Sequence, residues 1–223
     1  MASDKSSQTR SAIIDCAVHM ARRDGMAGLC MSKLARAMHM SRSGIFARVG
    51  GLDCLKNAVL LAYRPYFEDR VMLAGAGARP GLARLRVLFE SSVRHVMAPE
   101  RCLYIDAVLH GLPHSEVACA SGAWRRAFEA EARAALVNGE LAAPADPAQV
   151  AFELFGQLLA LACSMRAGGA CPVRALDAYA HIVRGCAPAP AAAARTPCPE
   201  PPFRWPAWLL ADASSTKEDH HAN

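Results

Sequence analysis

A chain of 223 residues with 53% hydrophobic side chains can bury a sizeable core, in one large domain or in a small domain plus a larger one. It has no apolar run of about 18 residues, and its first ten residues, MASDKSSQTR, lack the apolar core and cleavage site of a signal peptide. We therefore expect a cytoplasmic globular protein without a membrane partner. The nine cysteines form no CxxC pair, which disfavours a zinc ribbon or disulfide framework, so we expect most of them to be reduced, small hydrophobic side chains.

The positive charge is concentrated near the N-terminus. The formal net charge is +5, and residues 1–70 hold eleven Lys and Arg against six Asp and Glu, whereas residues 71–223 hold fourteen of each. Such a distribution is typical of a surface that faces phosphates. A solvated face that carries the excess by chance is the alternative.

The first helix is expected over residues 8–23, where Ile13, Ala17 and Met20 share one face. It ends in the sequence RRDG, which combines a cationic last turn with a glycine suited to the position after a helix. We expect this helix to pack on the segment that follows it.

Residues 31–49, MSKLARAMHMSRSGIFARV, predict two short helices joined by a tight turn. One face of the first helix is apolar at spacings of three and four: Met31, Leu34, Ala35 and Met38. Ser41 is a good N-cap for the second helix, because its hydroxyl can accept from the backbone N–H of Ser43 or Gly44. Exposed basic and hydroxyl residues on the second helix complete the pattern of a helix-turn-helix DNA reader.

The candidate DNA-contacting residues are Lys33, Ser41, Arg42, Ser43, Gly44, Phe46 and Arg48. Arg42 is the candidate for a guanine contact, because it lies near the N-terminal end of the second helix. Lys33 and Arg48 are better placed to hold phosphates. Phe46 either stacks on a sugar or thymine methyl or is partly buried, and each polar candidate has an ordinary solvated side chain as its alternative.

The fold is expected to be all-α, with about nine helices. Gly50 and Gly51 break the chain, and Asp53 can cap a helix that continues to about Met72. Further helices are expected over 82–97, 102–111, 116–138, 147–168 and 173–186. This predicts an N-terminal three-helix helix-turn-helix domain within residues 1–72, a larger helical domain over 80–186 for ligand binding and dimerisation, and a tail over 187–223.

The tail holds seven of the fourteen prolines and should be largely disordered. Its apolar cluster is a candidate docking patch: Phe203, Trp205, Trp208, Leu209 and Leu210.

The helix over 147–168 carries two apolar stripes, of which one can pack in the core and the other needs a partner. Together with the next helix, this favours a symmetric four-helix homodimer interface. The candidate interface residues are Leu154, Leu158, Leu161, Met165, Leu176 and Val183. A central helix buried on all sides of a monomer is the alternative.

The candidate small-molecule site combines aromatic and polar residues of the second domain, and core packing explains each of them equally well individually. They are Tyr104, Asp106, His110, Trp124, Phe128, Phe152 and Gln157. His110 and His114 have a helical metal-ligand spacing, but Pro113 lies between them and no third ligand is evident, so we expect neither metal nor cofactor. No nucleophile elbow, phosphate loop, HExxH or paired-carboxylate pattern appears, so we do not expect an enzyme.

The first-helix pattern, the sequence LARAMHMSRSGIFARV, the glycine break and the long helix over 147–168 resemble the tetracycline-repressor (TetR) family of transcriptional regulators. The resemblance is specific over residues 8–65 and architectural over 80–186. It implies a bacterial homodimer that binds operator DNA, and a small effector that releases the DNA, so that the chain acts as a repressor. A helical protein-interaction module or a small helical enzyme without DNA binding are the alternatives.

Several residues depart from the family pattern. Cys30 stands at the usual Thr cap of the first motif helix, and His39 stands at the usual turn glycine, where we expect a positive φ. Leu52 replaces a Lys that commonly binds phosphate. Arg48 and Val49 replace the usual His or Tyr and Phe. The resemblance therefore implies a weaker phosphate clamp, for which Arg48 or Lys56 can supply charge.

Overall fold

Helices form all of the regular secondary structure in the part of the chain that the computed structural model describes, residues 2–112, 114–169 and 171–188. The main helices are α1 (Ala2–Asp24), α2 (Met31–Ala37), α3 (Arg42–Val49), α4 (Leu52–Phe67), α5 (Leu82–Met97), α6 (Leu103–Leu109), α7 (Ser115–Val137), α8 (Pro147–Arg166) and α9 (Pro172–Gly185). This confirms the predicted all-α class. Apart from residues 187 and 188, the predicted tail and its docking patch lie outside the described residues.

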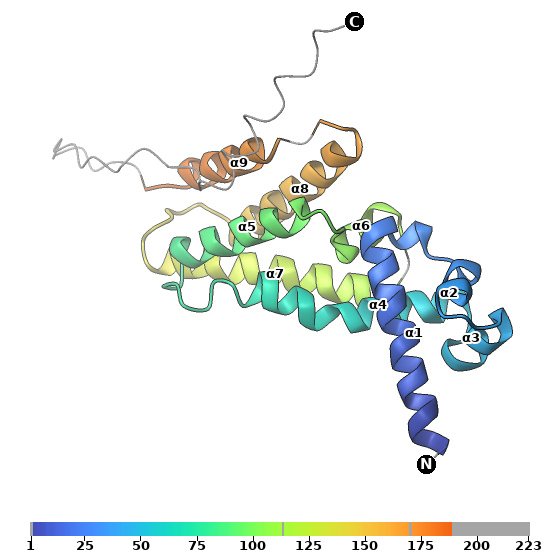
Figure 1. Cartoon of the computed structure of the whole chain (residues 1–223). Coiled ribbons are helices and arrows are strands. Elements are labelled where there is room, and N and C mark those ends of the chain that lie inside the picture. Colours follow the sequence, from blue (N-terminus) through green and yellow to red (C-terminus); the bar gives the residue numbers. More distant parts are fainter. Residues whose placement is uncertain (1, 113, 170, 189–223) are drawn as a thin grey trace, which may run out of the picture.

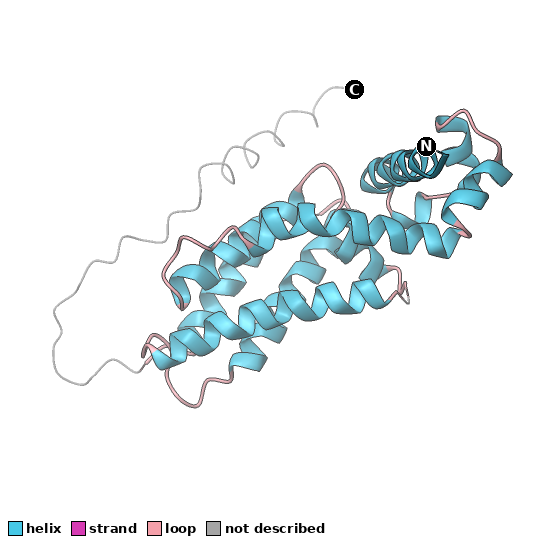
Figure 2. Cartoon of the chain, turned by 90° about the horizontal axis from the view of Figure 1, so that it is seen from below, coloured by secondary structure: helices cyan, strands magenta, loops and turns pink. Residues whose placement is uncertain are grey.

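The helices are arranged as a small head, formed by α1 to α3 and the start of α4, at one end of a longer body, formed by the end of α4 and α5 to α9 (Figure 1). Figure 2, turned by 90°, shows the same arrangement. In the head, Ile13 of α1, Leu34 of α2 and Ile45 of α3 are fully buried. Each of the three helices therefore contributes an apolar side chain to the core of the head, at a position that follows helical periodicity.

Helix α1 begins at Ala2 rather than at the expected residue 8, and it ends at Asp24, followed by Gly25 with φ 85°. A positive φ at this position suits glycine, as the sequence indicated.

Helix α4 connects head and body through one continuous set of buried apolar residues. Leu55, near its start, and Phe67, at its end, are both buried. The expected cap is wrong in one respect: Gly51 is the N-cap, and Asp53 lies in the first turn. The α-helix ends at Phe67 rather than at the expected Met72, and a π-helical turn, Glu68–Met72 (η2), follows it.

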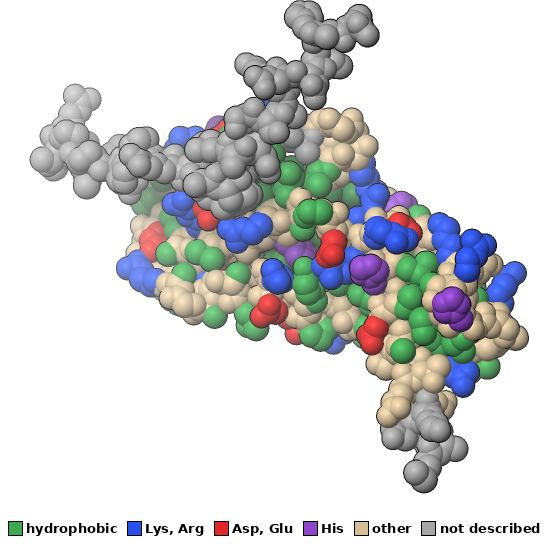
Figure 3. All heavy atoms as spheres, viewed as in Figure 1, with side chains coloured by type: hydrophobic (Ala, Val, Ile, Leu, Met, Phe, Trp, Pro, Cys, Tyr) green, Lys and Arg blue, Asp and Glu red, His purple; other side chains and the backbone are tan. Residues whose placement is uncertain are grey.

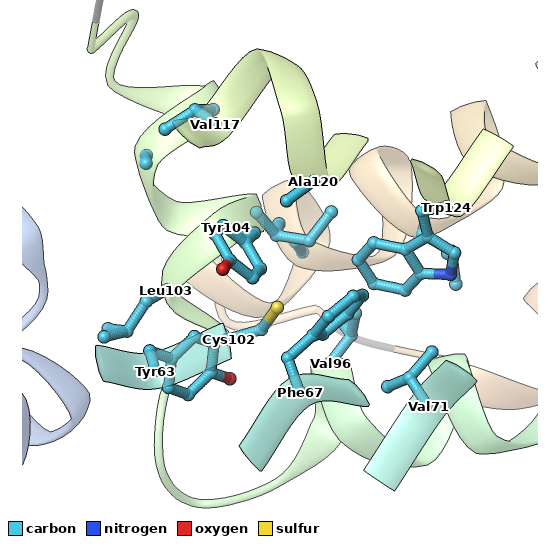
Figure 4. Packing of buried hydrophobic residues seen from close by; sticks show 14 of the residues in the cluster. Tyr63, Phe67, Val71, Val96, Cys102, Leu103, Tyr104, Val117, Ala120 and Trp124 are labelled. Atoms are coloured by element: carbon cyan, nitrogen blue, oxygen red, sulfur yellow. The ribbon is translucent and has the colours of Figure 1, made fainter. Parts of the chain in front are cut away.

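Trp124 of α7 lies at the centre of the body and is fully buried. Its indole N–H donates to the Ser92 hydroxyl of α5 at 2.9 Å. Phe67 and Phe155 meet its ring edge-on, with centroid distances of 4.8 and 5.7 Å. Figure 4 shows Phe67 pointing toward Trp124 from α4, so α4 and the body share one aromatic cluster.

Helix α8 packs against α5, α7 and α9. By length and composition it is also apolar enough to cross a membrane, with a mean hydropathy of 1.4, and 39% of that stretch is buried. Core helices of water-soluble proteins meet the same criterion, so this is weak evidence for a membrane span.

The assignment of the two α8 stripes requires a correction. Leu154, Leu158 and Leu161 are buried inside the chain, as is Leu176 of α9, because they pack on the body's own core. The opposite side of α8 exposes Phe152, Ala160 and Cys163 to solvent, whereas Gly156 and Leu159 are half-buried. Met165 and Val183 are half-buried.

The second predicted stripe, Ala151, Phe155, Leu159 and Ala162, is also largely covered, because Ala151, Phe155 and Ala162 are buried in the same core. Neither predicted stripe therefore faces solvent as a whole, and the exposed side of α8 is the one that carries Phe152 and Ala160.

The eight described cysteines are all free thiols. Among them, Cys102 is buried in the core, and Cys16 and Cys186 are partly buried against it, so the expected role as small hydrophobic side chains applies to these three.

Candidate nucleic-acid interface and ligand cavities

The turn between α2 and α3 depends on His39, which is the one described non-glycine residue with a positive φ, 51°. This left-handed conformation turns the chain so that the N–H of Met40 reaches the carbonyl of Ala35 at 2.9 Å. The expectation of a positive φ at His39 is confirmed. The turn therefore contains a left-handed residue that is His39, although glycine adopts this conformation most readily.

Both motif helices have side-chain caps. The Ser41 hydroxyl accepts from the N–H of Gly44 at 3.0 Å, which confirms the predicted N-cap of α3. Cys30 is the N-cap of α2, and its sulfur accepts from the N–H of Lys33 at 3.4 Å. A cysteine sulfur is a weak hydrogen-bond acceptor, so α2 keeps a side-chain cap but with a weaker hydrogen bond than a hydroxyl would make.

Most of the predicted DNA-contacting side chains share the open surface of α2 and α3. The exposed members are Lys33, Ser41, Arg42, Ser43 and Phe46, and Phe46 is 60% exposed despite its apolar ring. Gly44 is partly exposed. Figure 3 shows Lys and Arg side chains at this end of the molecule. An exposed Phe beside hydroxyl and basic groups suits contact with a sugar or a thymine methyl.

The electrostatic character of this surface follows from the sequence. No acidic residue lies between Asp24 and Asp53, so the motif's Lys and Arg side chains have no acid on their own segment. Its four cations are Lys33, Arg36, Arg42 and Arg48. Such an excess attracts a polyanion without specifying a base sequence.

Arg48 is less exposed than the other candidate cations, Lys33 and Arg42. It is half-buried, and its Nε is buried without a hydrogen-bond partner. Its guanidinium is therefore less available to phosphates than that of Arg42, which is exposed.

The seven predicted ligand-site residues do not meet in one cavity. Trp124 and Phe128 are fully buried core residues. Phe152 is 64% exposed on α8, and Gln157 lines a groove between α8 and α9. Tyr104, in contrast, lines a cavity between α4 and α7. Asp106 lines another cavity, at the junction of head and body, and His110 lies beside Asp106.

The cavity at Tyr104 has a volume of about 290 Å³ and mostly apolar walls, to which Phe67 and Met72 contribute. Its polar end is an ion pair in which the Arg64 Nε donates to Glu116 at 2.8 Å, and the Tyr104 hydroxyl donates to the same carboxylate at 3.0 Å. Burial, followed by this hydrogen bond, raises the pKa of Tyr104, so its hydroxyl stays protonated and remains a donor.

The Arg64–Glu116 pair was not predicted from the sequence. Its members lie 52 residues apart, on α4 and α7, and neither belongs to a motif. The same holds for the contact between Asp106 and the head, which spans 80 residues. A local sequence pattern carries no signal for such pairs.

Residues 81–177 match a family model described as "Tetracyclin repressor-like, C-terminal domain". Residues 81–177 therefore form a domain of the tetracycline-repressor (TetR) type. The matched segment is the half for which the sequence suggested only an architectural resemblance. No curated protein matches this chain in a sequence comparison.

Solved TetR-family structures have the same fold. A TetR transcriptional regulator from Chloroflexus aurantiacus J-10-FL has a TM-score of 0.68 at 15% identity, covering 81% of this chain and 95% of that one. A TetR-family transcriptional regulator from Cytophaga hutchinsonii has a TM-score of 0.67 at 12% identity, covering 83% and 98%. AibR, in complex with isovaleryl coenzyme A and operator DNA, has a TM-score of 0.60 at 19% identity, covering 78% and 95%.

Proposed function

We propose that this chain is a homodimeric repressor of the TetR family that binds a double-stranded DNA operator and releases it when a small molecule binds the body. In this proposal residues 1–72 are the DNA-binding domain and residues 80–186 the ligand-binding and dimerisation domain. The protein acts in the cytoplasm and catalyses no reaction.

The observation that carries the proposal is the acid-free surface of α2 and α3. Arg42 and Ser43 lie exposed in the first turn of α3, the part of a recognition helix that enters the major groove. Lys33, exposed on α2, lies where a phosphate contact would fix the orientation. The operator-bound relative AibR supports this use of the fold.

Dimerisation is supported by the uncovered face of α8. This face exposes Phe152 and Ala160 to solvent, with the half-buried Gly156 between them, at the four-residue spacing of one helix side. Beside it, a groove of about 480 Å³ runs between α8 and α9. A second copy that places its own α8 and α9 here would bury the apolar face and form an isologous four-helix interface.

The effector cavity in this proposal is the one at Tyr104. Its apolar walls suit an aromatic or aliphatic molecule, and the Arg64–Glu116 pair and the Tyr104 hydroxyl suit one polar group on it. The cavity includes the end of α4, whose start belongs to the head. A ligand that moves α4 would therefore alter the head as well.

The decisive experiment is retardation of the DNA upstream of the protein's own gene, in the presence of excess random DNA. Specific retardation that weakens as salt rises is the expected result. Binding to random and upstream DNA with equal affinity would contradict an operator-binding function. Absence of any DNA affinity would favour the protein-interaction module.

A further inference from the structure

A second cavity lies where head and body meet, separate from the cavity at Tyr104. It has a volume of about 250 Å³ and lies among the end of α1, the link between α5 and α6, α6 itself and the end of α8. Three arginines line it, namely Arg23, Arg101 and Arg166. We propose that this junction cavity binds a small amphipathic carboxylate.

The cationic side of the cavity has too few acidic partners. Arg166 donates to Asp106, and Arg101 lies 3.5 Å from the same carboxylate. In the described part of the chain, neither arginine forms an ion pair with any other acid. One carboxylate therefore serves two guanidinium groups, while the third arginine, Arg23, is held by Asp24.

Asp106 has further contacts that limit what it can offer to the arginines. It is 2% exposed, and its Oδ2 accepts from the backbone N–H of Met26 at 2.8 Å. Among the described residues, the Arg101 guanidinium makes no side-chain hydrogen bond, and its side chain is 43% exposed. Its N–H groups remain free to bind a carboxylate in the bidentate geometry that guanidinium favours.

The opposite wall of the cavity is apolar and therefore suits an apolar part of the ligand. Val96, Ile105 and Met165 line the cavity together with Ala162 and give it an apolar side. A short hydrocarbon chain with a terminal carboxylate satisfies both sides, whereas an uncharged alcohol satisfies only the apolar one.

Binding also has a consequence for the head, and this part rests on the proposed function. A ligand carboxylate competes with Asp106 for Arg101 and Arg166. Asp106 joins α6 to Met26, at the start of the short helix Met26–Gly28 (η1) between α1 and α2. Binding at the junction therefore alters the support of the DNA-reading helices.

Titration calorimetry of the full chain with hexanoate tests the site without DNA. Acetate and 1-hexanol are the matched probes, since each keeps one half of the ligand. We expect hexanoate to bind about tenfold or more tightly than either probe. Equal binding of hexanoate and 1-hexanol, or no heat up to about 10 mM hexanoate, would overturn the proposal.

Arg101→Gln locates the binding, and this variant should fold because the guanidinium makes no side-chain hydrogen bond within the described chain. Its hexanoate affinity should fall about ten- to a hundredfold. The control Arg184→Gln, at an exposed position in the last turn of α9, should bind like the wild type. Unchanged hexanoate affinity in Arg101→Gln would place the ligand elsewhere and refute the junction site. If the chain binds no operator, the proposed function fails while the calorimetric result still decides this site.

Discussion

The carboxylate of Asp106 in α6 accepts a 2.8 Å hydrogen bond from the backbone N–H of Met26, directly after the end of α1. The same carboxylate is paired with Arg166 at the end of α8. One buried side chain thus ties the head to two helices of the body, and both contacts draw on its negative charge.

Replacing Asp106 with alanine should lower the free energy of unfolding by about 2–3 kcal/mol, because it leaves the Met26 N–H and the Arg166 guanidinium without their acceptor and removes the ion-pair partner of Arg101. Chemical denaturation monitored by circular dichroism measures the change. Asp177→Ala, at an exposed position on α9, is the control and should stay within about 0.5 kcal/mol of the wild type. Equal losses in the two variants would show that Asp106 has no special structural role.

Arg42→Ala should lose about 1–3 kcal/mol of discrimination between operator and random DNA, because a base contact carries sequence information. Lys33→Ala should weaken both DNAs by similar factors, because a phosphate contact does not. Fluorescence anisotropy at two salt concentrations separates the two effects. Loss of equal size on both DNAs for both variants would count against the assignment of Arg42.

Ala160→Lys should convert a dimer into a monomer. Ala160 lies on the uncovered face of α8, and an isologous interface would bring two copies of the new charge close together. We expect dimer affinity to fall about a hundredfold, measured by size exclusion with light scattering. Ala130→Lys, on an exposed site of α7, should leave the molar mass unchanged. A wild type that is monomeric at all concentrations would contradict the proposed interface.

His95 should make the protein sensitive to mild acid. Burial lowers the pKa of His95 to about 4, with contributions from the nearby Arg22 and Arg70, and the Tyr63 hydroxyl lies 2.6 Å from its Nε2. Burial also raises the pKa of Tyr63, so the tyrosine stays protonated and hydrogen-bonds to the neutral imidazole. The folded state therefore disfavours the charged histidine.

The resulting stability is present above the unfolded pKa of about 6.5 and is lost as the pH falls toward 4, because the unfolded chain then binds the extra proton. The total effect is about 3 kcal/mol. His95→Gln should flatten this part of the stability profile relative to the wild type, as measured by denaturation at a series of pH values. Parallel wild-type and variant profiles would assign the acid sensitivity to other groups.

His39→Gly should stabilise the protein by about 0.5–1 kcal/mol. Glycine relieves the strain of φ 51°, while the greater entropy of its unfolded state offsets part of the gain. His39→Ala should act in the opposite direction, because alanine tolerates the left-handed region less well than histidine. Thermal unfolding of the three proteins tests the order, and a destabilised His39→Gly would contradict it.

The sequence by itself determined the features that depend on neighbours along the chain. Helical periodicity and capping residues predicted the all-α class, the α2–turn–α3 motif and the Ser41 cap, because each depends on residues within about one or two helical turns. The exposed reading surface followed for the same reason: Arg42 and Ser43 lie on the face of α3 opposite its buried residues. The positive φ of His39 was implied by the family resemblance, in which glycine usually stands at this turn position.

Only the tertiary structure decided what depends on distant segments. The sequence predicted that one of two apolar stripes on α8 would need a partner, but packing on α5 and α7 buries both Leu154 and Phe155, one from each stripe, and leaves Phe152 exposed to solvent. The predicted ligand residues likewise lie in the core, on the surface, in the groove between α8 and α9 and in two cavities, because their positions along the helices do not determine which cavity a side chain enters. The hydrogen bond of Asp106 with the Met26 backbone and the ion pair of Glu116 with Arg64 arise because folding brings together polar groups 80 and 52 residues apart. Buried charges need such partners, and a linear pattern does not show which partners the fold supplies.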